Sequence, residues 1–138
     1  MPTMPFFYVG SKARLVPAIL KHLAPHSCWV EAMCGTAVVT LSKPRSRVEV
    51  INDLNRHIWN FFVCCRDHYD ALAWKVFWTP YSRVCYEEWA AELASKVPER
   101  PDPDLAAKWF FVQHASFGGK FGSGFAADPR PRADFFVR

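Results

Sequence analysis

A glycine and an aspartate, Gly35 and Asp53, are the residues whose types and spacing best suit ligand binding. Gly35 lies in a turn of small residues, 34–37, where a glycine lets a ligand approach the backbone closely. Asp53 follows an apolar run, and its charge strengthens hydrogen bonds accepted from two neighbouring hydroxyls. Their separation, 53 − 35 = 18 residues, is close to the roughly 20 between the glycine turn and the ribose-binding acid of dinucleotide folds. The pair predicts a nucleoside site, although a βαβ unit that binds nothing has the same features.

The flanking segments are expected to bring both residues to one edge of a sheet. Residues 29–33 form a mostly apolar run typical of a strand, and residues 48–51 form a second one. Residues 37–42 between them suit a short helix, which Pro44 ends. Ligands of such α/β units bind at the carboxyl ends of parallel strands. The sequence therefore predicts half of a Rossmann-like α/β unit with the candidate site at its strand ends.

Lys12 is a further candidate, because it follows an aromatic residue, Tyr8, and a flexible corner at Gly10. Ser11 can cap the helical stretch that begins here, and Pro17 indicates either a separate first turn or a helix that begins at the proline. Taken alone, Lys12 is explained better by a solvated lysine at the start of a helix.

Helical patterns dominate the chain after residue 54. His57 and His68 lie in the first predicted helix without a partner cluster, so they are expected to be ordinary surface or core residues. The predicted helices are residues 55–72 with Asn55 as cap, residues 82–95 with Ser82 as cap, and residues 102–114 with Asp102 and Pro103 at the start.

Residues 116–125 have a different composition, with four glycines, three phenylalanines and one lysine. Such a loop can approach a nucleic-acid backbone closely and use a phenylalanine to stack on bases or wedge between them. A flexible loop whose phenylalanines attach it to the core is equally compatible with this composition.

Composition sets limits on the class of protein. The 138 residues are enough for one modest domain, and a net charge of +4 is compatible with a polyanionic partner without requiring one. The five cysteines include no C-x-x-C pair and no cysteine–histidine spacing typical of zinc, so no metal site is expected. Their odd number, without a signal peptide, indicates free thiols in a reducing cytoplasm. No apolar run approaches 18 residues, which argues against a membrane span.

Three segments occur in an order and spacing that one known family shares. They are residues 5–20, which begin Pro-Phe-Phe-Tyr-Val-Gly-Ser-Lys, residues 29–39, which begin Trp-Val-Glu-Ala-Met-Cys-Gly-Thr, and residues 48–55, which end in Asn-Asp-Leu-Asn and are followed by Asn-Phe-Phe at residues 60–62. Together they resemble the opening aromatic-Ala-Gly-Gly-Lys, the Glu-Pro-Phe-Ala/Cys-Gly-Gly/Ser turn and the Asn-Asp-Leu-Asn of Dam-type DNA adenine methyltransferases. Residues 79–83, followed by residues 109–120 and 124–129, resemble the region that leads into the target-recognition insertion of that family. The resemblance covers nearly the whole chain.

The resemblance implies a partial Rossmann-like α/β fold of the S-adenosylmethionine-dependent methyltransferases. Residues 1–78 are then the cofactor-binding part, and residues 79–138 are a helical region leading into the DNA-recognition insertion. S-adenosyl-L-methionine is the implied cofactor and double-stranded DNA the implied partner, with methyl transfer to the exocyclic amino group of adenine as the reaction. Asp53 is expected on the ribose diol and Lys12 on the carboxylate of the amino-acid tail.

The resemblance also implies a set of binding residues. Departures from the family pattern are Tyr8 for Trp, Ser11 for Gly, Ala32 and Met33 for Pro-Phe, and Thr36 for Gly or Ser, and we expect them to alter affinity more than identity. The expected cofactor-binding residues are Tyr8, Gly10, Lys12, Glu31, Met33, Cys34, Gly35, Asp53 and Leu54, and the expected DNA-binding residues are Phe117, Gly118, Gly119 and Lys120.

The catalytic motif of the family, an Asp-Pro-Pro-Tyr type segment that holds the flipped adenine, is not found. Asp102-Pro103-Asp104-Leu105 and Asp128-Pro129-Arg130-Pro131 both lack the aromatic residue in the fourth place. We therefore expect no catalytic residue in this chain, which is then truncated, completed by a second chain, or a degenerate relative that only binds. The apolar run at residues 135–137, which suggests an interrupted strand, favours truncation.

Other functions are weighed against DNA methylation. A methyltransferase for RNA or protein remains open, because substrate choice resides in the insertion and the missing motif. A Rossmann-type dehydrogenase is disfavoured, because the first turn lacks G-x-G-x-x-G. Restriction-linked, regulatory and phage-borne roles are all compatible with the sequence.

Overall fold

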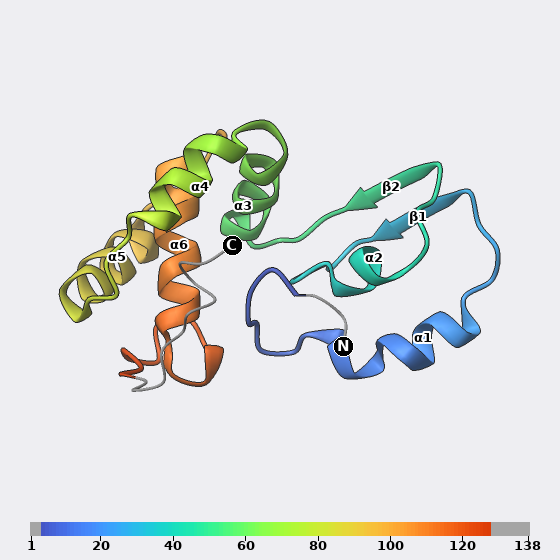
Figure 1. Ribbon diagram of the computed structural model, residues 1–138, viewed down its shortest axis with the longest axis horizontal. Helices are drawn as coiled ribbons and strands as arrows, with labels where there is room; N and C mark the ends of the chain where they lie inside the picture. The colour runs from blue at the N-terminus through green and yellow to red at the C-terminus, as the bar shows by residue number, and fades with distance from the viewer. Residues whose placement is uncertain (1–3, 128–138) are drawn as a thin grey trace. The chain divides into compact units, whose positions relative to one another are not determined.

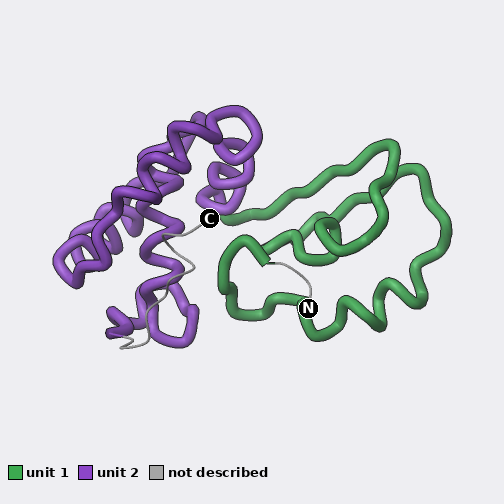
Figure 2. Tube along the Cα trace, viewed as in Figure 1, with its two compact units in different colours: residues 1–55 green, residues 56–138 purple. Residues whose placement is uncertain are grey.

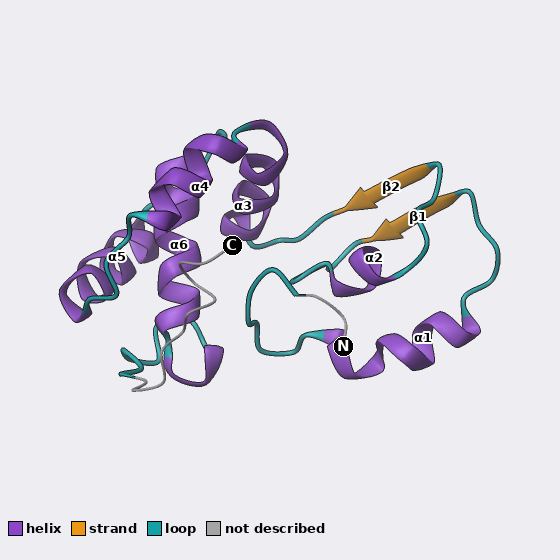
Figure 3. Ribbon diagram, viewed as in Figure 1, coloured by secondary structure: helices purple, strands orange, loops and turns teal. Residues whose placement is uncertain are grey.

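An α/β segment comes first in the chain and a helical segment follows it (Figure 3). The computed structural model describes residues 4–127, so the predicted strand at residues 135–137 and the segment 128–131 lie outside the described residues. The chain divides into two compact units, residues 1–55 and residues 56–138 (Figure 2). The division at residue 78 separates a cofactor-binding part from a part that leads to DNA recognition, and it stays a prediction.

Unit 1 contains a parallel pair of strands, β1 (Cys28–Glu31) and β2 (Val48–Ile51), joined through the short helix α2 (Val38–Ser42) (Figure 1). Cys28 pairs with Val48 and Glu31 with Ile51, so the two carboxyl ends lie side by side. The α2 side of β1 is fixed by Thr40, whose hydroxyl accepts the indole N–H of Trp29 at 2.8 Å. The predicted strand–helix–strand unit is confirmed, with bounds shifted by one or two residues.

The opening of the chain forms a single 3₁₀ turn, η1 (Lys12–Leu15), followed by α1 (Val16–His22). Pro17 lies in the first turn of α1, as predicted, because a proline there sacrifices no intrahelical hydrogen bond. Val16 packs with Val38 and Val39 of α2 as the small core of this unit. The core attaches the amino-terminal segment to α2.

Unit 2 is helical in its described part, and its first helix differs from the prediction. The single helix expected over residues 55–72 is wrong: α3 (Arg56–Asp67) ends before His68, whose φ of −134° is not helical, and α4 (Tyr69–Phe77) begins after it. Both α3 and α4 pack on α6 (Pro103–Ala115), each as a separate helix. Tertiary packing therefore overrides the helical periodicity at this position.

The other helix starts follow local rules to different degrees. Asp102 caps α6 as predicted, because its side chain accepts the N–H groups of Asp104 and Leu105 at 2.9 and 3.1 Å. Ser82 precedes α5 (Arg83–Ser95), but its side chain makes no capping bond. None of the helices in residues 4–127 is long and apolar enough to cross a membrane.

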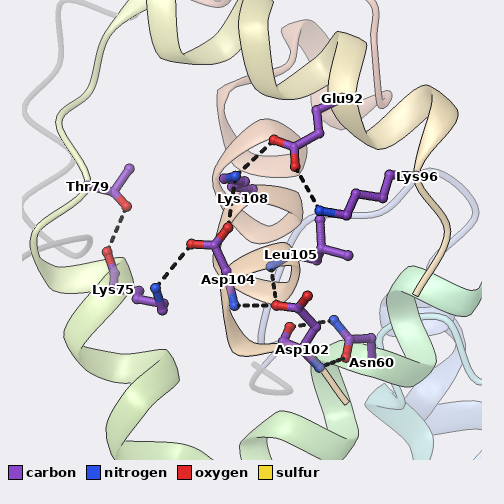
Figure 4. Close-up of polar contacts among 9 residues, drawn as sticks. All are labelled: Asn60, Lys75, Thr79, Glu92, Lys96, Asp102, Asp104, Leu105 and Lys108. Carbon is purple, nitrogen blue, oxygen red and sulfur yellow. Dashed lines mark hydrogen bonds and ion pairs between the residues drawn. The ribbon is translucent and has the colours of Figure 1, made fainter. Parts of the chain in front are cut away.

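An ion network joins α4, α5 and α6 (Figure 4). The ammonium of Lys108 lies 2.8 Å from Glu92 and 2.8 Å from Asp104, and Lys75 lies 3.1 Å from the same Asp104. Burial lowers the pKa of Lys108, but hydrogen bonds to Asp104 and Glu92 outweigh it and raise the pKa overall. The network therefore links the three helices of unit 2 through their charged side chains.

Candidate functional site

A hydrogen bond joins Gly35 to Asp53, which lies 18 residues later in the sequence. The Gly35 N–H donates to Asp53 Oδ2 over 2.8 Å, and Asp53 Oδ1 accepts the Asn55 N–H over 3.0 Å. Gly35 has a φ of +50°, a backbone conformation that favours glycine. The turn after β1 and the acid after β2 are therefore one local structure.

The backbone explains why this bond forms. Beyond the last paired residues of the strands, the Asn52 N–H donates to Glu31 O at 3.0 Å and the Cys34 N–H donates to Asn52 O at 2.8 Å. The turn then closes on itself, since the Ala37 N–H donates to Cys34 O at 2.7 Å. Because of these bonds, the segment after β1 and the segment after β2 lie side by side as far as Asp53.

Lys12 reaches the same turn from η1. Its ammonium donates to Met33 O at 3.0 Å and lies 3.4 Å from Glu31 Oε1. Lys12 thus attaches to the backbone two residues before Gly35. The structure brings this lysine together with Gly35 and Asp53, which sequence spacing alone could not establish.

Glu31 is a buried carboxylate with two different oxygens. Oε2 accepts the Thr40 N–H at 3.1 Å and the Thr40 hydroxyl, which orients the carboxylate toward the turn. Oε1 accepts no hydrogen bond from the described residues and faces only the Lys12 ammonium. The residue is 5% exposed, so an acceptor without a hydrogen bond here is costly unless a donor arrives.

The pKa of the Cys34 thiol depends on the charged groups around the turn. Burial, followed by the carboxylates of Asp53 and Glu31, raises the pKa of Cys34 to about 11, and Lys12 opposes this rise. The thiol is therefore protonated at neutral pH and is no nucleophile. The three charged groups all act on one buried thiol, so they surround the same turn.

The remaining predicted residues differ in how they relate to this cluster. A Cβ on Gly35 would lie 3.5 Å from the Tyr8 ring, so the ring covers the turn. Gly10 lies in the corner that the Ser11 N–H closes by donating to Tyr8 O. The side chains of Met33 and Leu54 are 77% and 92% exposed, and their contact with a ligand stays a prediction.

Sequence reasoning missed two residues that organise the site. Thr40 orients Glu31, and Asn52 joins the two strand ends through its backbone and through its amide, which donates to Ala32 O at 3.1 Å. Asn52 belongs to the Asn-Asp-Leu-Asn segment at residues 52–55, and the resemblance of that segment to the family could have indicated its role. Thr40 carried only a weak signal, as a hydroxyl within an apolar helix.

The predicted DNA-binding residues lie together in the glycine-rich loop of unit 2. Phe117 and Gly118 belong to the 3₁₀ turn η2 (Phe117–Gly119), and Phe117 is 72% exposed. Lys120 follows directly and is also exposed. Among the described residues, no group of three His, Cys, Asp or Glu side chains is placed to hold a metal ion.

Comparison with known proteins identifies the family. A model of the D12 class N6 adenine-specific DNA methyltransferases matches residues 8–88, which include Tyr8, Lys12, the 34–37 turn and Asp53. Comparison with curated proteins finds no significant relative. The match extends over more than half of the chain, so the chain belongs to the D12 class N6 adenine-specific DNA methyltransferase family.

Proposed function

We propose that unit 1 binds S-adenosyl-L-methionine for transfer of its methyl group to the exocyclic amino group of adenine in DNA. In this proposal the parallel strand pair is part of a Rossmann-like methyltransferase fold, and this chain supplies its cofactor-binding half. The cluster formed by Lys12, Glu31, Gly35 and Asp53 is the observation that carries the proposal.

The charges of the cluster match those of the cofactor. Its amino-acid tail is a zwitterion, and Lys12 offers a cation while Glu31 Oε1 offers an acceptor 3.4 Å away. The buried Oε1 has no hydrogen bond from the described residues, so it suits the ammonium of the tail. The carboxylate of the tail would then share Lys12, which retains a proton for it after bonding Met33 O.

Asp53 has capacity left for the ribose diol. Each of its oxygens accepts one backbone N–H, and a carboxylate offers about four lone-pair sites in all. The backbone bonds therefore hold the carboxylate in place without saturating it. The Tyr8 ring beside Gly35 adds an aromatic face that can attract the sulfonium.

Holding the adenine is assigned to residues outside this cluster. Asp102, the acid of the first Asp-Pro candidate, is engaged as the cap of α6, and its backbone bonds the Asn60 amide at 2.8 Å. This engagement supports the absence of a base-holding motif at residues 102–105. A second chain is one source of the missing half, and a module that binds cofactor or DNA without turnover is the alternative.

Duplex DNA is assigned to the loop that bears Phe117 and Lys120. The exposed ring suits a wedge between bases, and the exposed ammonium suits a phosphate. In functional terms residues 1–78 would bind the cofactor and residues 79–138 would lead to DNA.

A methyl-transfer assay tests this proposal. The purified chain is incubated with tritium-labelled S-adenosylmethionine and either unmethylated duplex DNA or structured RNA, and label in the nucleic acid is counted. With the chain alone we expect labelled cofactor to be retained by the protein on a filter and no label to reach either nucleic acid. Transfer to DNA would overturn the incomplete-site part of the proposal, and transfer to RNA would overturn the substrate.

A further inference from the structure

The hydroxyl of Tyr86, on α5, lies at the base of the glycine-rich loop and bonds two of its residues. It lies 3.0 Å from Ser116 Oγ and accepts the Gly124 N–H at 3.1 Å. Tyr86 is 4% exposed, so these bonds form away from water. One side chain of a neighbouring helix thus holds both ends of the loop.

The protons of this arrangement can be assigned. The hydroxyl of Ser116 donates to Val112 O at 2.7 Å, and Ser116 Oγ also accepts the Gly122 N–H at 3.3 Å. A hydroxyl has one proton, so Tyr86 must be the donor in its bond to Ser116. The result is a directed chain from Gly124 N–H through Tyr86 and Ser116 to Val112 O.

The backbone of the loop closes at the same place. Ser116 and Phe125 form an antiparallel bridge, with the Phe117 N–H donating to Gly124 O at 2.9 Å. Gly124 has a φ of +104°, so only a glycine presents its N–H to Tyr86 in this way without strain. The Gln113 amide adds a bond of 2.6 Å to Gly119 O near the tip.

The loop therefore presents one phenylalanine and retains another. The ring of Phe125 lies 5.1 Å from Tyr81 and 5.7 Å from Tyr86, whereas Phe117 is 72% exposed. The exposed ring and Lys120 therefore belong to a segment whose two ends are held by the bridge and by Tyr86.

We infer that the Tyr86 hydroxyl is a latch that orders the loop for DNA, which makes Tyr86 a positioning residue for DNA binding. This inference rests on the proposed function, in which Phe117 and Lys120 contact DNA. A loop ordered in advance avoids the entropy of ordering on binding, so affinity depends on the latch although Tyr86 does not touch the DNA.

The latch is tested with five variants of the full chain: Tyr86→Phe, Tyr69→Phe, Phe117→Ala, Lys120→Ala and Ser116→Ala. Tyr86→Phe removes the hydroxyl and keeps the ring against Phe125. Tyr69→Phe is the control, because it removes a hydroxyl from an exposed tyrosine at the start of α4. Phe117→Ala removes the proposed wedge at an exposed position. Ser116→Ala, which breaks the same chain from the loop side, serves if Tyr86→Phe fails to fold.

Three measurements are made on each variant. Amide hydrogen exchange of Gly124 reads the latch itself, and anisotropy with a labelled duplex reads affinity. Fluorescence of duplexes of mixed sequence, in which 2-aminopurine replaces single adenines in turn, is measured at saturating protein and reads base unstacking in the complex separately from affinity. We expect Tyr86→Phe to speed Gly124 exchange, weaken binding about tenfold and reduce the fluorescence increase, with Tyr69→Phe within about twofold of the parent.

The outcomes distinguish the claim that Tyr86 is a latch from the claim that the loop contacts DNA. If Phe117→Ala weakens binding and Tyr86→Phe does not, the latch is wrong and the DNA assignment stands. If Phe117→Ala and Lys120→Ala both leave binding unchanged, the loop does not contact DNA, and the proposed function fails at this point together with the latch.

Discussion

Asp53 accepts the Gly35 N–H at 2.8 Å, and this one bond joins the turn after β1 to the acid after β2. The bond fixes a carboxylate beside a glycine turn that the Tyr8 ring borders, 3.5 Å from where a Cβ on Gly35 would lie. Lys12 and Glu31 complete the cluster from η1 and β1. Each part of this arrangement can be changed separately.

Replacing Lys12 tests the tail-binding role. Lys12→Ala removes the cation that the carboxylate of the cofactor would use, so we expect affinity for S-adenosylmethionine to fall by about tenfold or more. Arg14→Ala removes the same charge from the exposed neighbouring residue of η1 and is expected to leave affinity unchanged. Equilibrium dialysis with labelled cofactor measures both, and equal losses would mean that only net charge matters.

Gly35→Ala tests the turn. The new Cβ would meet the Tyr8 ring at an ordinary 3.5 Å, so the cost arises from the φ of +50° and not from a clash. A cost of about 1 kcal/mol corresponds to a fall in Tm of about 3 °C. Thermal unfolding with Ala32→Ser as control measures it, and an unchanged Tm would show that the turn tolerates a side chain.

The buried Lys43 predicts a dependence of stability on acid. Its ammonium donates to Glu49 Oε1 at 2.6 Å and to Ser46 Oγ at 2.7 Å. The Lys43 hydrogen bond, helped by the Ser46 N–H, lowers the pKa of Glu49 below its usual 4.5. The stability this carboxylate contributes is therefore present above pH 4.5 and is lost as the pH falls through its lower folded pKa.

Glu49→Gln isolates this contribution. We expect the variant to have a lower Tm than the parent at pH 7 and a gap that closes as the pH approaches 3. Glu87→Gln, an exposed acid on α5, should show no such gap. A gap that persists unchanged at low pH would exclude ionisation of Glu49 as its cause.

The thiols provide a second prediction on pH. The pKa of Cys34 is about 11 against an ordinary 9.0, so its unfolded form loses its proton first, and stability should fall between about pH 9 and 11. Iodoacetamide at pH 8 should label the exposed Cys28 at least about tenfold faster than Cys34. Mass spectrometry of the labelled peptides measures this, and faster labelling of Cys34 would mean an open, ionised thiol.

Much of the secondary structure was predictable because its signals lie close together in the sequence. The strand–turn–helix–strand order follows from short apolar runs and from small residues, and the Asp102 cap follows from one acid before one proline. The break at His68 could not be predicted, since packing of α3 and α4 on α6 decides it.

For the candidate site and the glycine-rich loop, the sequence predicted which residues take part but not which of them contact one another. That Lys12 meets Met33 O, or that Tyr86 bonds Ser116 and Gly124, depends on contacts between segments 21 to 38 residues apart. Such contacts leave no periodicity in the sequence. The sequence paired Gly35 with Asp53, and the structure shows a hydrogen bond between them, whereas the bond from Thr40 to Glu31 is seen only in the structure.

The most direct test of the central claim is isothermal titration of the chain with S-adenosylmethionine. Asp53→Ala removes the proposed acceptor of the ribose diol, and Asp70→Asn removes a charge from the exposed first turn of α4 as control. The account predicts binding by the parent and by Asp70→Asn, and a loss of about 100-fold or more in Asp53→Ala. Equal affinity in Asp53→Ala, with its fold retained, would contradict the assignment of this cluster to the cofactor.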